Sequence, residues 1–146
     1  MGFIFGRKSR HGKRDYLKQF KIGEAEYSES LIYESYGGLQ NDGLMLAIYY
    51  DVDTTKIVHQ LDSWKKISDF QAISSILKNV SSYFGLDFEI PKIANGNFQL
   101  YDNSQHKELY SEAEINTLLL HSEDVNFSLA VWDAEKNAIY IIEYRI

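Results

Sequence analysis

Residues 125–146, VNFSLAVWDAEKNAIYIIEYRI, constrain the fold more strongly than any other stretch of this sequence. Two runs rich in residues that favour strands flank a short polar turn at residues 133–137. Two strands joined by so short a turn lie side by side and run antiparallel. The first prediction is therefore a sheet that contains this C-terminal hairpin.

The first half of the chain predicts a second group of strands. Residues 31–36 have apolar spacing that allows a helix or a strand, of which we favour the strand. Residues 44–50, LMLAIYY, are rich in strand-favouring residues and indicate a central strand buried on both faces. Residues 51–55 interrupt this run, and residues 56–61, KIVHQL, resume an extended pattern. Three strands joined by two short loops predict an antiparallel meander.

The clearest helix is predicted for residues 69–84, where apolar side chains repeat at helical spacing along one face. Ser68 and Gln71 have the spacing of a capping box, and Gly85 stands where a left-handed C-terminal cap belongs. A second box, from Ser111 to Glu114, predicts the start of a shorter helix.

Short strands are predicted between the two helices, at residues 87–90 and 97–102. The order of elements is then strands, helix, strands, helix, strands. This order predicts an α+β fold with a mostly antiparallel sheet, made of the meander and the C-terminal hairpin, and two main helices packed on it.

The charge divides the chain, whose length of 146 residues predicts a single domain over residues 1–146. Residues 1–21 contain seven Lys or Arg and one Asp, which gives +6, and residues 22–146 contain eight Lys or Arg and twenty Asp or Glu, which gives −12. A basic N-terminal segment thus leads into an acidic body. Because like charges repel, this body is a poor ligand for nucleic acid, and its natural partners are basic surfaces.

One segment has the pattern of a catalytic motif. The apolar run 44–50 is followed by Asp51-Val-Asp53-Thr-Thr55, which resembles the first motif, D-x-D-x-T, of the haloacid-dehalogenase-like phosphatases. The resemblance implies a magnesium-dependent hydrolase with Asp51 as the nucleophile and Asp53 as the general acid and base. The other residues that the resemblance implies are Lys78 or Lys92 and the late acidic pair Glu123 and Asp124.

The match covers five residues and the strand before them. The family has a parallel sheet in which this strand leads into a helix, whereas residues 56–61 are predicted here as another strand. The alternative interpretation is a loop in which Asp and Thr side chains bond to their own backbone. The histidines do not have H-E-x-x-H spacing, and no G-x-S-x-G or phosphate-loop pattern occurs, so we predict no metal and no cofactor.

The character of the chain favours a binding protein, because it is small, acidic, free of cysteine and rich in tyrosine. Immunity proteins (antitoxins) of bacterial toxin systems have this character, since an acidic surface matches the active site of a basic nuclease. We therefore expect a cytoplasmic protein whose partner is a basic protein. Carboxylates in predicted loops and at element ends are expected to make the contacts. These residues are Asp51, Asp53, Asp62, Glu123 and Asp124.

Three other functions stay open at this point. A phage-encoded inhibitor of a nucleic-acid enzyme would share the acidic character. A small phosphatase-like hydrolase would use Asp51 with magnesium. A peripheral membrane adaptor would use the basic N-terminus.

The basic N-terminal segment has two aromatic side chains in front of its cations. It can dock on the acidic body, anchor weakly to an anionic membrane surface, or form a nucleic-acid arm. We rank docking first and the membrane surface second. The residues concerned are Phe3, Phe5, Arg7, Lys8, Arg10, Lys13 and Arg14.

Deletion of residues 1–14 tests the docking interpretation. We expect a lower melting temperature, because fully burying one phenylalanine contributes roughly 1.5–3 kcal/mol. Thermal unfolding and sedimentation with anionic vesicles are the two measurements. An unchanged melting temperature together with lost vesicle binding would instead support the membrane arm.

Overall fold

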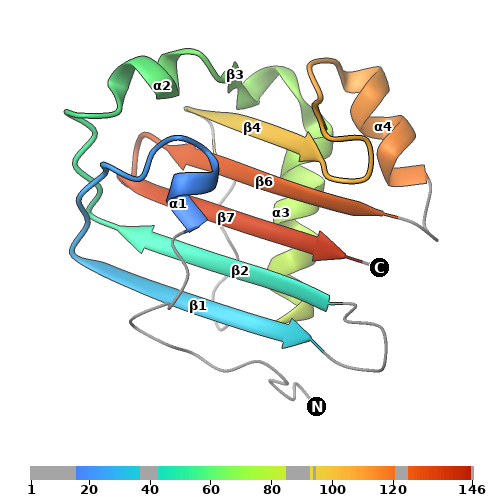
Figure 1. Cartoon of the computed structure of the whole chain (residues 1–146), viewed down its shortest axis with the longest axis horizontal. Helices are drawn as coiled ribbons and strands as arrows, with labels where there is room; N and C mark the ends of the chain where they lie inside the picture. The colour runs from blue at the N-terminus through green and yellow to red at the C-terminus, as the bar shows by residue number, and fades with distance from the viewer. Residues whose placement is uncertain (1–15, 37–42, 85–92, 94, 121–124, 146) are drawn as a thin grey trace.

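The fold is built around one antiparallel sheet (Figure 1). The computed structural model describes residues 16–36, 43–84, 93, 95–120 and 125–145, and within them seven strands pair in one sheet. The strands are β1 (Glu29–Tyr36), β2 (Gly43–Tyr50), β3 (Lys65–Lys66), β4 (Gly96–Asp102), β5 (Lys107–Glu108), β6 (Asn126–Asp133) and β7 (Ala138–Arg145). The helices are α1 (Tyr16–Gln19), α2 (Val58–Asp62), α3 (Gln71–Tyr83) and α4 (Glu112–Leu120), with a 3₁₀ helix at Ile67–Asp69. The predicted α+β fold is confirmed.

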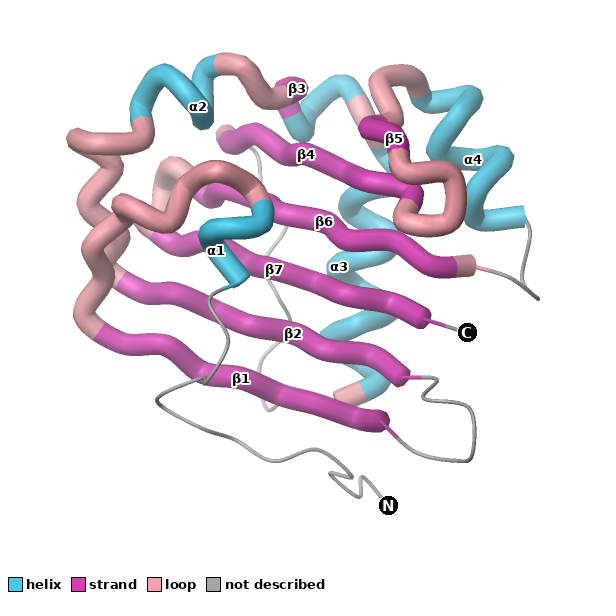
Figure 2. The backbone as a smooth tube through the Cα atoms, in the orientation of Figure 1, coloured by secondary structure: helices cyan, strands magenta, loops and turns pink. Residues whose placement is uncertain are grey.

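The strand order is β1-β2-β7-β6-β4-β3, and β5 pairs with the end of β4 (Figure 2). The predicted C-terminal hairpin is confirmed, since β6 and β7 pair from Asp133 opposite Ala138 to Asn126 opposite Arg145. Strand β2 pairs with β1 on one side and with β7 on the other. The hairpin of β1 and β2 is thereby joined to the C-terminal hairpin.

Alternate side chains of the central strands enter two separate cores, because successive residues of a strand point to opposite faces. Leu46 of β2 and Ile142 of β7 lie opposite each other and fill the core on one face. Their neighbours Ala47 and Ile141 fill the core on the other face. All of residues 44–49 are buried, so the prediction of a central strand buried on both faces is confirmed.

Each face of the sheet has its own helical cover. Helix α3 lies behind the sheet in Figure 1 and buries one apolar side, of which Ile73 and Leu77 are members. Helix α1 lies in front, and Leu17 and Phe20 pack into the second core. We call these two sides the α3 face and the α1 face. The ring of Phe20 meets that of Trp64 edge-on at 6.3 Å between centroids.

The predicted third strand of the meander, residues 56–61, is wrong. These residues lead into helix α2, and β2 takes β7 as its second neighbour instead. Ile57 and Leu61 are both buried in the core of the α1 face, and His59 between them is exposed. A spacing of four residues puts the two apolar side chains on one side of a helix. The pattern that we read as the alternation of a strand is therefore the spacing of a helix.

The two predicted capping boxes have different outcomes. At Ser111 the box is formed, since its Oγ accepts from the Glu114 N–H at 3.1 Å and Glu114 Oε1 accepts from the Ser111 N–H at 3.2 Å. At Ser68 the prediction is wrong, because α3 starts at Gln71 with Phe70 as its N-cap and has no side-chain cap. Ser68 belongs to the preceding 3₁₀ helix. The predicted strand at residues 87–90 lies outside the described residues.

These outcomes give a matched pair of substitutions. Ser111→Ala should lower the free energy of unfolding by about 1 kcal/mol, because the first turn of α4 loses its cap. Ser68→Ala should have almost no effect, because the exposed Ser68 caps no helix in the structure. Urea unfolding followed by circular dichroism measures both. Equal losses for the two variants would contradict the assignment of the caps.

Candidate binding surface

The segment with the predicted catalytic motif lies at one end of the sheet. Strand β2 ends at Tyr50, and Asp51 follows with a positive φ of 53°. Val52 then donates its N–H to the carbonyl of Asn137 in the turn between β6 and β7. Asp53 forms an isolated antiparallel bridge with Glu26, ahead of β1. Three parts of the chain therefore meet where β2 ends.

The side chains of this segment hold its own turns. Ser28 Oγ donates to Asp51 Oδ2 at 2.5 Å. The Thr55 hydroxyl and the Thr55 N–H both donate to Asp53 Oδ1, at 2.5 and 3.0 Å. The Thr55 side chain first, and its N–H second, hold the pKa of the exposed Asp53 below its usual value, because both bonds favour the charged carboxylate.

The structure departs from what the phosphatase resemblance implies. Helix α2 does follow Asp53, but the next strand, β3, pairs antiparallel with β4. Both neighbours of β2 are antiparallel to it as well. The parallel arrangement that the family requires is therefore not the one that surrounds Asp51, and the interpretation as a hydrogen-bonded turn describes this segment better.

Exposed carboxylates surround this segment and form a surface that we call the acidic end. Its carboxylates belong to Glu26, Glu29, Asp51, Asp53 and Glu135, all of them exposed. Two lysines share this end: Lys56, whose Nζ lies 3.4 Å from Glu26 Oε1, and Lys136 in the adjoining turn. Tyr27 stands beside the carboxylates, 45% exposed, with its ring edge-on against Tyr49. The acidic end thus combines a net negative charge with one partly exposed aromatic ring.

The other predicted partner-binding residues are Asp62, Glu123 and Asp124. Asp62 is exposed at the last position of α2, five residues after the buried Ile57. Glu123 and Asp124 lie outside the described residues. So does the whole basic N-terminal segment named above, from Phe3 to Arg14, because the description begins at Tyr16.

The opposite end of the sheet contains two cavities that the sequence did not predict. A cavity of about 410 Å³ lies where the β4–β5 hairpin faces α4, between Asp102 and Lys107 on one side and Glu114 on the other. A second, of about 220 Å³, lies on the α1 face beside Asn126 and Ser128. No linear motif marks either cavity. The walls of the smaller one come from elements far apart in the sequence, and those of the larger one from a hairpin and a helix that only packing brings together.

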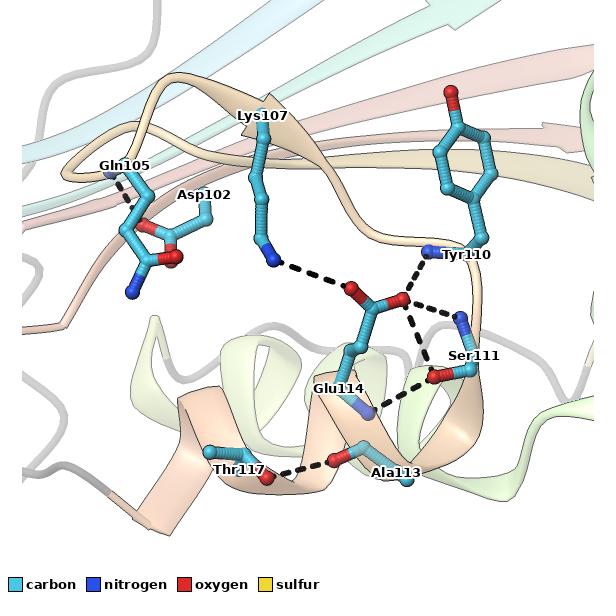
Figure 3. A network of polar contacts seen from close by, with 8 residues as sticks. All are labelled: Asp102, Gln105, Lys107, Tyr110, Ser111, Ala113, Glu114 and Thr117. Carbon is cyan, nitrogen blue, oxygen red and sulfur yellow. Dashed lines mark hydrogen bonds and ion pairs between the residues drawn. The ribbon is translucent and has the colours of Figure 1, made fainter.

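A polar network includes several residues that line the larger cavity (Figure 3). Lys107 of the hairpin and Glu114 of α4 point toward each other, and Lys107 Nζ lies 3.3 Å from Glu114 Oε2. The Tyr110 N–H, the largest cause, and then Lys107 and Ser111 lower the pKa of Glu114 by bonding to its charged form. The carboxylate of Glu114 therefore joins the cap of α4 to the hairpin.

Comparisons with protein-family models, with curated proteins and with solved structures found no match for this chain. Across the described ranges, no helix is both long and apolar enough to cross a membrane. Within the same residues, no three His, Cys, Asp or Glu side chains are grouped so that they would hold a metal ion.

The turn at Asp53 gives a prediction about acid titration. Because its pKa is lowered in the folded protein, the bonds from Thr55 stabilise the fold above the unfolded pKa, and this contribution is lost as the pH falls through the folded pKa. Thr55→Val should raise the pKa of Asp53 toward its usual value, measured by carboxyl ¹³C NMR. Ser28→Ala, which removes the bonds from Ser28 Oγ to Asp51 and to the Tyr50 carbonyl but none to Asp53, is the control and should leave Asp53 unchanged. No change in Thr55→Val would mean that the hydroxyl does not bond to Asp53 in solution.

Proposed function

We propose that this chain is an acidic binding protein of the immunity-protein (antitoxin) type, which neutralises a basic bacterial toxin such as a nuclease by covering its active-site surface. The observation that carries the proposal is the acidic end, which has five exposed carboxylates and only two lysines and is therefore negatively charged. The charge of −12 on residues 22–146, from eight Lys or Arg and twenty Asp or Glu, supports it. The proposal places the protein in the cytoplasm, where such a toxin would act.

The geometry of the acidic end suits recognition of a basic surface. Carboxylates clustered on one side attract a cationic partner over long range and speed its association. Asp51 and Asp53 are already held by bonds from Ser28 and Thr55, so binding orders them at little further cost in entropy. Tyr27 adds a partly exposed aromatic ring, a residue type that is enriched among the strongest interface contacts.

A co-expression experiment tests the function itself. The product of the reading frame that neighbours this gene should inhibit bacterial growth when expressed alone. Co-expression with this chain should restore growth, and the purified proteins should form a complex. A neighbour that is not toxic, combined with inhibition of a host nucleic-acid enzyme by this chain, would favour the phage-encoded inhibitor instead.

Charge reversal tests the surface. Asp51→Lys should slow association with the partner several-fold at low salt, because it places a cation at the centre of the acidic end. Asp62→Lys is the matched control, since it makes the same charge change at an exposed position on α2. Stopped-flow association rates at low and high salt give the comparison, and high salt should abolish the difference. If the two variants slow association equally, the overall charge of the protein controls the association rate and no localised binding surface exists.

A further inference from the structure

The cavity between the β4–β5 hairpin and α4 combines an apolar floor with a charged rim. Its volume of about 410 Å³ lies within the range of sites that bind small molecules. Leu109 and Leu118 are buried and line it, the first after β5 and the second on α4. Asp102, Lys107 and Glu114 supply charged groups around this floor.

The charged side chains that line the cavity leave one carboxylate without an opposite charge. Lys107 and Glu114 neutralise each other, with 3.3 Å between Nζ and Oε2. The remaining carboxylate, Asp102, is only 6% exposed. Its Oδ1 accepts from the N–H groups of Ser104 and Gln105 at 3.0 and 3.3 Å, and no cation among the described residues pairs with it.

A buried carboxylate that has two backbone donors but no cationic partner among the described residues, beside an apolar floor, selects one kind of occupant. Desolvating a carboxylate is costly, and an opposite charge at hydrogen-bond distance offsets that cost. An anion would be repelled, and a hydrated metal ion would gain nothing from Leu109 and Leu118. A cation on an aliphatic stem satisfies both parts of the cavity, because such side chains bury their stem while the charged head finds a polar partner.

We propose that this cavity receives a lysine or arginine side chain of a basic partner protein. The aliphatic stem lies against Leu109 and Leu118, and the cationic head pairs with the carboxylate of Asp102. The cavity lies at the end of the sheet opposite the acidic end, so it is a second and separate contact. The proposal rests on the proposed function only in taking the partner to be basic.

Asp133 provides a matched control inside the same fold. It is also buried, at 3% exposed, and its Oδ1 accepts from the N–H groups of Glu135 and Lys136 at 3.1 and 3.3 Å. Asp102 and Asp133 thus make the same local turn, but only Asp102 lines the cavity. In Asp102→Asn and Asp133→Asn the amide oxygen still accepts both N–H bonds, so each variant loses the charge and keeps its turn.

The experiment is a titration of the full ¹⁵N-labelled chain with pentylguanidinium, followed by amide NMR shifts. Shifts at Gln105, Lys107 and Thr117 should saturate. Asp102→Asn should weaken this binding about tenfold or more, as expected for the loss of a charged hydrogen-bond partner. Asp133→Asn should bind as the unchanged protein does. Pentanoate, an anion on a similar chain, should cause no saturating shift at these residues.

Equal affinity of Asp102→Asn and the unchanged protein would overturn the proposal, and so would binding of pentanoate as strong as that of pentylguanidinium. Urea unfolding checks that each variant is folded. Should Asp102→Asn be unfolded, Thr117→Trp fills the cavity from an exposed position on α4 and must abolish the shift at Gln105. Because the probe replaces the partner, these results stand whether or not the co-expression experiment succeeds.

Discussion

Strands β2, β7 and β6 carry apolar side chains on both faces, and the rest of the structure is arranged to cover them. A sheet buried on both faces needs a layer on each side, which α3 supplies on one and α1 with α2 on the other. Side chains such as Leu46 and Ile141 leave no room for charged groups in the middle of these three strands. The charged groups of these strands therefore lie near the strand ends.

The two ends of the sheet are built in different ways. At the acidic end, Asp51 and Asp53 are held by bonds to residues of neighbouring loops and turns. At the other end, the larger cavity exists only because α4 packs beside the β4–β5 hairpin, with Lys107 and Glu114 joining them. The first end brings together carboxylates from residue 26 to residue 135, whereas the larger cavity is formed within residues 102–118 by the packing of a hairpin on a helix.

The length of each apolar pattern explains how much of the fold the sequence could predict. The C-terminal hairpin and the strand at residues 44–50 have long apolar patterns, and both predictions are confirmed. Residues 56–61 were predicted wrongly, because Ile57 and Leu61 fit both the spacing of a strand and that of a helix over so short a segment.

The same limit applies to caps and sites. Ser68 and Ser111 have equivalent local sequence patterns, but a 3₁₀ turn at Ile67–Asp69 displaces the start of α3 away from Ser68. The sequence pointed to Asp51 and Asp53 because they are neighbours in one short motif, and their role in binding stays a prediction. Asp102 was not named, because its burial and the absence of an ion pair with it among the described residues are properties of the folded chain.

The pairing of β2 with β7 has a consequence for how the chain reaches its native state. Leu46 and Ile142 are partners in the sheet although 96 positions separate them along the chain. During synthesis, β1 and β2 emerge long before β7, so the apolar second edge of β2 stays without its neighbour in the nascent chain. Such distant pairings slow folding and leave a strand edge open to aggregation. The second edge of β2 therefore stays open to wrong partners until β7 has been synthesised and pairs with it.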